Sequence, residues 1–358
     1  MTSRSRFPTA ACVATLLAAL LTPAAQAQAP YSRFDEAPLE AEPSPDPDGA
    51  ASRASQAYLQ RTAAALADGG DSRELAFAAT LRRLALAPPD DGDPSSETPS
   101  SAAPDDAQAA AWRRRAADTA GSDVVALALA TQGEPDADRQ LRLAARWLAA
   151  DPDNLAPLLF RGGTADTLLR DARASRRFDL QMLPQIRVMQ AALLRHPPTA
   201  AERDALGDAS GGDAAEQAAM TAAGLWSAVA IPSLQLLTQA CDPARLRDAT
   251  RLQDCRHVAT LLADASDTQL GRGLGLMLLD QTAGTADERA RAQAARRTLD
   301  WQMLEWGRAV QAQPRDGAPQ FVRLLADPSV RSEPDLILRV LQDAGIAPTP
   351  PAGWQPPR

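Results

Sequence analysis

The 358-residue chain contains no lysine and only two histidines. The absence of lysine excludes the Ser-x-x-Lys hydrolases and the Walker type of nucleotide site, and it is typical of codon usage in a high-GC bacterium. A histidine-based triad would have to use His196 or His257. Searches for Gly-x-Ser-x-Gly and His-Glu-x-x-His find nothing in the sequence. The motifs therefore predict no catalytic residue.

Residues that favour β-strands are also scarce. Aromatic residues make up 4% of the chain, and the only asparagine is Asn154. Strands are enriched in β-branched and aromatic residues, and tight hairpins favour Asn-Gly or Asp-Gly turns. Alanine, leucine, arginine, glutamine and glutamate, which are abundant here, are good helix formers. We therefore predict an all-α protein.

The N-terminus has the pattern of a cleavable signal peptide. Arg4 and Arg6 precede an apolar run over residues 10–21, and Ala25-Gln26-Ala27 supplies a small-x-small cleavage site. Cys12 lies at the start of this run, which argues against lipid attachment. We expect cleavage after Ala27 and a periplasmic or secreted mature protein.

The mature protein is expected to be acidic. The formal net charge is −8, from 37 basic and 45 acidic residues, and loss of Arg4 and Arg6 leaves 35 basic residues and a charge of about −10. Such a chain has no evident surface for neutralising phosphates, so we expect no nucleic-acid partner. An acidic protein also gains nothing from anionic lipids.

Composition and periodicity divide the chain into segments. The signal peptide (1–27) is followed by a disordered leader (28–50), an N-terminal helix pair (51–87), a low-complexity linker (88–106), a main helical-repeat domain (107–346) and a Pro-rich tail (347–358). Within the main domain we expect single helices over 164–195 and 213–240, each kinked or split by its proline, Pro184 or Pro232.

Two junctions in the main domain resemble each other. ADPDNLAPLLFR (150–161) and AQPRDGAPQFVR (312–323) each end one helix before a proline and begin the next with a proline near its first turn. Residues 123–161, about one and a half repeats, resemble a tetratricopeptide-type repeat, although Gln140 stands where that family usually has a small residue. The resemblance implies stacked antiparallel helical hairpins in an α-solenoid; an irregular helical bundle is the alternative.

The segment CDPARLRDATRLQDCRH contains Cys241, Cys255 and His257. Asp242-Pro243 should break the preceding helix, and a capping box from Thr250 to Gln253 predicts the next helix start at Thr250. The intervening loop would let the two cysteines meet, and an exported protein enters an oxidising compartment, so we predict a disulfide. Free thiols are a second possibility. A shared metal ion is disfavoured because Cys255 and His257 would point away from each other on a helix.

Two further stretches have competing interpretations. GRGLGLMLLD (271–280) could be a phosphate loop, but no strand precedes it, and we expect Gly271 and Gly275 to allow close helix–helix approach instead. The uncharged stretch 217–241 is long enough to span a membrane, but its polar residues and Pro232 favour a bent internal helix. We predict no stable membrane insertion of the mature chain.

One long helix near the C-terminus carries a predicted core stripe and one outlying tryptophan. Leu299, Met303, Trp306 and Val310 have the spacing of a buried face. Trp301 lies off this stripe and is expected to line a groove or to form a second packing face.

These features predict a non-enzymatic protein-interaction module of the cell envelope, with protein partners and no cofactor or metal. Two alternatives remain. One is an envelope enzyme with a carboxylate-based site, for which Asp179, Asp280 and Glu305 are candidate acids that the sequence cannot pair. The other is a small-molecule binder with an apolar cavity in its core. A deep pocket with two facing acids would favour the enzyme, and an open groove would favour the interaction module.

Overall fold

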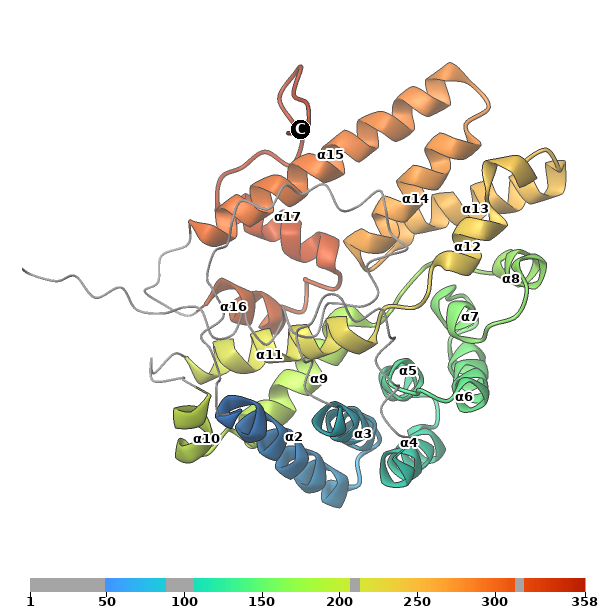
Figure 1. Cartoon of the computed structure of the whole chain (residues 1–358). Coiled ribbons are helices and arrows are strands. Elements are labelled where there is room, and N and C mark those ends of the chain that lie inside the picture. The colour runs from blue at the N-terminus through green and yellow to red at the C-terminus, as the bar shows by residue number, and fades with distance from the viewer. Residues whose placement is uncertain (1–48, 88–105, 207–212, 313–318, 358) are drawn as a thin grey trace, which may run out of the picture. The chain divides into compact units, whose positions relative to one another are not determined.

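The computed structural model describes residues 49–87, 106–206, 213–312 and 319–357 (Figure 1). Within these ranges every named element is a helix, and β-pairing is limited to two isolated bridges. The all-α prediction is confirmed. The expected signal peptide, nearly all of the leader and of the linker, and the centre of the second proline junction lie outside the described residues.

The chain forms two compact units. One contains the described parts of 1–116 and 188–228, and the other contains 117–187 and 229–357. The boundaries fall within α4 (Ala107–Ala120) and α9 (Met182–Arg195). The sequence pattern predicts that 188–228 belong to the main body, whereas in the structure this segment groups with the N-terminal helices.

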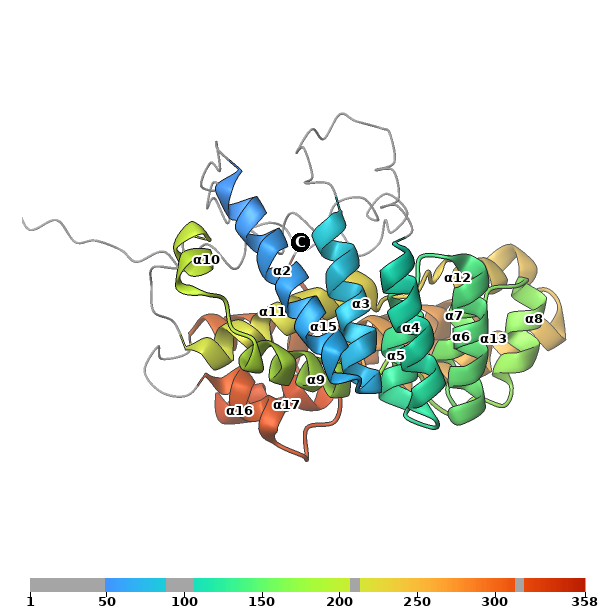
Figure 2. The same ribbon diagram turned by 90° about the horizontal axis from the view of Figure 1, so that it is seen from below.

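The first unit begins with a helical pair, α2 (Ala50–Gly69) and α3 (Ser72–Leu86), which pack against each other (Figure 2). Gly70 ends α2 with a φ of 76°, and the Asp71 side chain caps α3 by accepting the backbone N–H groups of Arg73 and Glu74. Both predicted helices are confirmed. Two later helices complete the unit, α10 (Ala200–Ala205) and α11 (Ala214–Val229).

The second unit is built from consecutive helices that pack on their neighbours. α5 packs on α6, α13 on α14 and α14 on α15, as in helical hairpins. Membership of the tetratricopeptide family stays a prediction. The helices are α5 (Val124–Gln132), α6 (Ala137–Ala150), α7 (Ala156–Phe160), α8 (Ala165–Ala172), α12 (Gln235–Ala240), α13 (Ala249–Ala265), α14 (Gln269–Thr282), α15 (Ala286–Gln311), α16 (Gln320–Ala326) and α17 (Glu333–Asp343).

The single helix predicted over 164–195 is wrong. α8 ends at Ala172 and α9 begins at Met182, with non-helical chain between them. Phe178 N donates to the Ala265 carbonyl, and Asp267 N donates to the Phe178 carbonyl, so this segment is tied to a corner far away in the sequence. Pro184 consequently lies in the first turn of α9, where proline is tolerated.

The predicted interruption at Pro232 is confirmed as a split, so the stretch 217–241 is not the one bent helix that was expected. α11 ends at Val229 and α12 begins at Gln235, so the proline lies between two helices. No described helix combines the length and apolarity that crossing a bilayer requires.

Asn154 holds the corner between α6 and α7. Its side-chain oxygen accepts the backbone N–H groups of Ala156 and Asp179, each at 3.0 Å. Its amide nitrogen donates to the Asp151 carboxylate at 3.0 Å and to the Asp179 carbonyl at 2.8 Å. The residue is fully buried. The corner therefore fixes the non-helical segment that precedes α9.

Gly271 and Gly275 allow α14 to approach its neighbours closely. A Cβ at Gly275 would overlap backbone atoms of Ala263 and Leu262 in α13, and one at Gly271 would overlap the Ser266 Oγ. The predicted close helix–helix approach is confirmed at Gly275, whereas Gly271 meets the Ser266 side chain and the Phe178 ring, which lie outside the helices. Thr268 caps the start of α14, since its hydroxyl accepts the Gly271 N–H.

Candidate functional site

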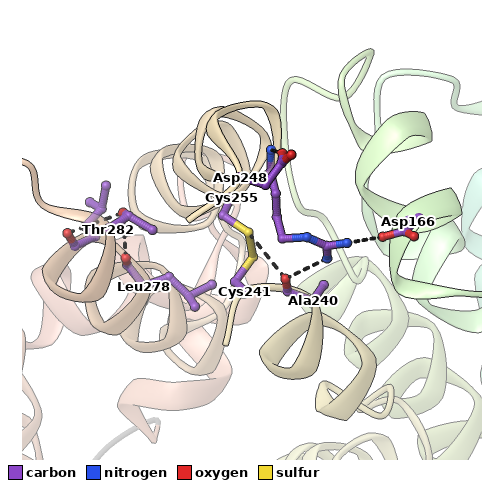
Figure 3. The surroundings of a disulfide bond; sticks show 9 residues. Asp166, Ala240, Cys241, Asp248, Cys255, Leu278 and Thr282 are labelled. Carbon is purple, nitrogen blue, oxygen red and sulfur yellow. Dashed lines mark hydrogen bonds and ion pairs between the residues drawn. A yellow bond between two sulfur atoms is a disulfide. The ribbon is translucent and has the colours of Figure 1, made fainter. Parts of the chain in front are cut away.

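The disulfide lies where α12 ends and α13 begins. Cys241 and Cys255 are joined, with Cα atoms 5.7 Å apart, and both residues are fully buried (Figure 3). The prediction of this pairing is confirmed, but the predicted helix start is wrong. Asp248 caps α13 by accepting the Arg251 N–H, so the helix begins at Ala249, one residue before Thr250.

Arg251 connects this corner to its surroundings. Its guanidinium donates to the Ala240 carbonyl at 3.0 Å and pairs with Asp166 of α8 (Figure 3). The disulfide and Arg251 together fix α13 relative to α12 and α8. Since the Cys255 sulfur is bonded to Cys241, it is not a thiolate ligand in this structure. In the described ranges, no group of three or more potential metal ligands occurs.

A hollow of about 420 Å³ opens next to this corner, and it is the candidate functional site. Four of its residues lie on α13 at positions i, i+3, i+4 and i+7, which is one face of a helix. The fifth, Arg173, follows the end of α8. The lining residues are Arg173, Thr250, Gln253, Asp254 and His257.

The charged groups of the hollow neutralise each other. Arg173 donates from Nε and Nη2 to the two Asp254 oxygens, at 2.7 and 2.8 Å. This two-point ion pair raises the pKa of Arg173, mainly through the hydrogen bonds to Asp254. The acid is buried while the guanidinium is half exposed. The pair leaves no unpaired carboxylate in the lining of this hollow.

The histidine of the hollow also contacts the backbone. His257 Nε2 lies 3.2 Å from the Ala172 carbonyl oxygen, and because that oxygen only accepts, Nε2 carries the proton in this contact. Thr250 and Gln253 are exposed and offer a hydroxyl and an amide. The side chains that line the hollow thus offer both hydrogen-bond donors and acceptors.

The candidate acids are distributed over different environments. Asp280 accepts a hydrogen bond from Gln293 Nε2 at 3.1 Å, and Glu305 pairs with Arg308 at 2.7 Å. Asp179 adjoins a second acid, Asp267, that the sequence analysis did not select.

Asp179 and Asp267 fix the backbone that leads into α9. The Asp267 carboxylate accepts the N–H groups of Leu180 and Met182, at 2.9 and 3.1 Å. Asp179 accepts the backbone N–H and the side-chain amide of Gln181, at 2.8 and 2.7 Å. Gln181 has a φ of 60°, an uncommon conformation for a residue other than glycine. Both acids therefore have a structural use here.

Burial shifts a pKa in the cluster formed by Asp179, Asp267 and their neighbours. It raises the pKa of Asp267 well above its ordinary range, and the negative charge of Asp179 adds to the increase. Glu333, at the start of α17, is half-buried, and desolvation raises its pKa as well. Arg177 lies 4.0 Å from Asp179 and pairs with Asp151. The cluster thus contains protonatable groups held inside the protein.

Trp301 packs beneath the C-terminal tail. Its indole N–H donates to the Ala347 carbonyl at 2.9 Å, and its ring contacts Trp354. The predicted stripe on the same helix is only partly right, because Leu299 is buried but Val310 is 45% exposed. Val310 lies at the end of α15, one residue before its last position, where packing is incomplete.

Sequence reasoning missed the pairs that join distant segments. Arg173 and Asp254 are 81 residues apart, and Asp267 contacts residues more than 80 positions away. Local patterns carry no signal for such contacts. Asn154 could have been selected, because a lone asparagine before a proline-started helix is typical of a side chain that bonds local backbone.

Comparison of the chain with family models, curated proteins and solved structures finds no match.

Proposed function

We propose that this chain is an exported, non-enzymatic interaction module that binds a polypeptide segment of an envelope protein in the hollow on α13. The single observation that carries the proposal is the composition of this hollow. It is open, all five of its lining residues have polar or charged side chains, and its one acid is already paired with an arginine.

The geometry favours binding over carboxylate catalysis. General acid–base chemistry needs a titratable group that reaches the substrate, usually with a second group facing it. In the hollow, Asp254 uses both oxygens on Arg173. Asp179 and Asp267, an adjacent pair of acids outside the hollow, are instead bonded to backbone N–H groups. They suit a structural role better than a catalytic one.

The hollow offers what a polypeptide backbone requires. The Thr250 hydroxyl and the Gln253 amide can donate and accept, and polypeptides present alternating carbonyl and N–H groups. The disulfide and the Arg251 contacts hold the α13 face in place, which lowers the entropic cost of binding. A preformed surface of this kind fits recognition of a segment in an extended conformation.

Two features support the proposed location. Residues 1–27 have the signal-peptide pattern, and disulfides form and persist in oxidising compartments such as the bacterial periplasm. Cys241 and Cys255, the two cysteines of the predicted mature chain, are the two that are joined.

The test is a quantitative pull-down from periplasmic extract. Gln253→Arg places a long charged side chain in the hollow and leaves Arg173 and Asp254 in the sequence, and Gln281→Arg makes the same change at an exposed site on α14. We expect the parent and Gln281→Arg to enrich the same protein partner to a similar extent. Gln253→Arg should recover at least tenfold less of this partner. Equal recovery with all three proteins, or no enriched protein, would refute the proposed site.

A further inference from the structure

The chain after α17 lies along α15 and is held by side chains of that helix. Gly345, with a φ of 68°, turns the chain out of α17, and Ile346 N donates to the Leu341 carbonyl at 2.8 Å. The following residues return to the middle of α15 (Figure 1). This is a different surface from the hollow on α13.

Two neighbouring residues of α15 bind two successive carbonyl groups of the tail. Trp301 Nε1 donates to the Ala347 oxygen, and Gln302 Nε2 donates to the Pro348 oxygen, each at 2.9 Å. Proline-rich segments have few backbone N–H groups, so their carbonyls remain free to accept. Aromatic surfaces that dock proline-rich peptides exploit this property.

An aromatic contact completes the site. The rings of Trp301 and Trp354 meet edge to face, with centroids 5.4 Å apart. Trp354 N donates to the Pro351 carbonyl at 3.1 Å, and Gly353 has a φ of 79°, so a turn brings Trp354 back onto the helix. The tail between 346 and 357 contains no charged residue. The binding of the tail to α15 therefore depends on its carbonyl groups, its prolines and the indole of Trp354.

The tail is held by few contacts. Most of its residues are exposed, and only Ile346, Pro350, Trp354 and Pro356 are partly buried. Segments with few buried contacts and exposed hydrogen bonds open at a low cost in free energy. A tethered segment has an effective concentration in the millimolar range, so it fills the site even when its intrinsic affinity is weak. A free segment with the same chemistry can therefore compete for the same donors.

We propose that Trp301 and Gln302 form a recognition site for uncharged proline-rich segments, and that residues 346–357 occupy it in cis until such a segment of a partner protein displaces them. The tail acts as a built-in competitor. Its presence restricts the site to partners that are abundant or that bind more tightly than the tail does.

The experiment measures binding of a fluorescent peptide with the sequence of residues 346–357 by anisotropy. Trp354→Ala in the full chain weakens the tail in cis and leaves the helix face unchanged. We expect the peptide to bind this variant at least tenfold more tightly than it binds the parent. A chain ending at Gly345 provides a second version of the open site, with folding of both variants checked by circular dichroism.

Site variants and a control peptide separate specific from general binding. In the Trp354→Ala background, Trp301→Phe removes one hydrogen bond and should weaken peptide binding roughly fivefold to tenfold. Trp306→Phe on the same helix is the matched control and should have no effect. Failure of the peptide to bind either folded open variant would overturn the proposal. Equal binding of a peptide with alanine in place of every proline would overturn it as well.

Discussion

Asn154 shows how much of this fold depends on single polar residues. It satisfies two backbone N–H groups and one backbone carbonyl in a fully buried corner. Removal of a buried hydrogen-bonding side chain leaves its partners unsatisfied, which costs about 1–3 kcal/mol for each group. The lone asparagine of the chain is thus the residue that joins the α6–α7 corner to the segment before α9.

Asn154→Ala should therefore lower the free energy of unfolding by roughly 2–4 kcal/mol. Urea denaturation followed by circular dichroism measures this change. Gln281→Ala removes an exposed side-chain amide and should change the stability by less than about 0.5 kcal/mol. A loss at Asn154 no larger than that at Gln281 would contradict the role given to the corner.

Gly275 is required for a different reason, because the α13 backbone occupies the space of a Cβ. Gly275→Ala should cost about 1–3 kcal/mol by forcing the two helices apart. Gly307→Ala is the matched control: it lies inside α15, and nothing lies within 4 Å of an added Cβ. It should stabilise the protein by about 0.5–1 kcal/mol, since alanine is the better helix former. The two variants should shift the thermal midpoint in opposite directions, and a shift in the same direction would rule out the close approach.

At the scale of elements, helix ends were predictable where a local signal specifies them. Gly70 and Asp71 separate α2 from α3 in the sequence and in the structure. The break before α9 was not predictable, because its cause is Asp267, more than 80 residues away. Helix propensity favoured a continuous helix there, and long-range hydrogen bonds outweigh it. The hollow is a similar case, since Arg173, which follows α8, and Asp254, in α13, are 81 residues apart.

The Asp179–Asp267 contact predicts how stability depends on pH. Burial and Asp179 raise the pKa of Asp267, so the folded chain binds more protons than the unfolded chain above about pH 4. The stability from this group is complete below that pH and is lost as the pH rises through the raised pKa. Asp179→Asn removes the neighbouring charge and should reduce this loss. The free energy of unfolding of Asp179→Asn, measured in urea from pH 4 to pH 8, should therefore fall less with rising pH than that of the parent.

Asp327 provides a control with the opposite sign. Hydrogen bonds from Ser329, aided by Arg339, lower its pKa to about 2. The contribution of Asp327 to the stability of the folded protein is present above about pH 4 and is lost as the pH falls towards 2. Asp327→Asn should change only this acid limb. Parallel profiles of Asp179→Asn and the parent between pH 4 and pH 8 would show that the two carboxylates do not interact.

At the scale of the whole molecule, one covalent link is added to a fold made only of helices in the described ranges. The cysteines are 14 residues apart, and closing a loop of this size stabilises a protein by about 3 kcal/mol in the chain-entropy account. The double variant Cys241→Ala/Cys255→Ala should lose about this amount in urea unfolding and should keep its helical circular dichroism. Alkylation of both thiols in the unreduced parent, detected by mass spectrometry, would exclude the link.

We propose that the α13 hollow binds a protein partner in the cell envelope. The most direct measurement places a photo-crosslinking amino acid at position 253, in the hollow, or at position 281 on α14, in cells that export the chain. We predict that light produces a discrete heavier adduct containing a second protein from position 253 and not from position 281. Adducts of equal yield from both positions, or none from position 253, would contradict the account.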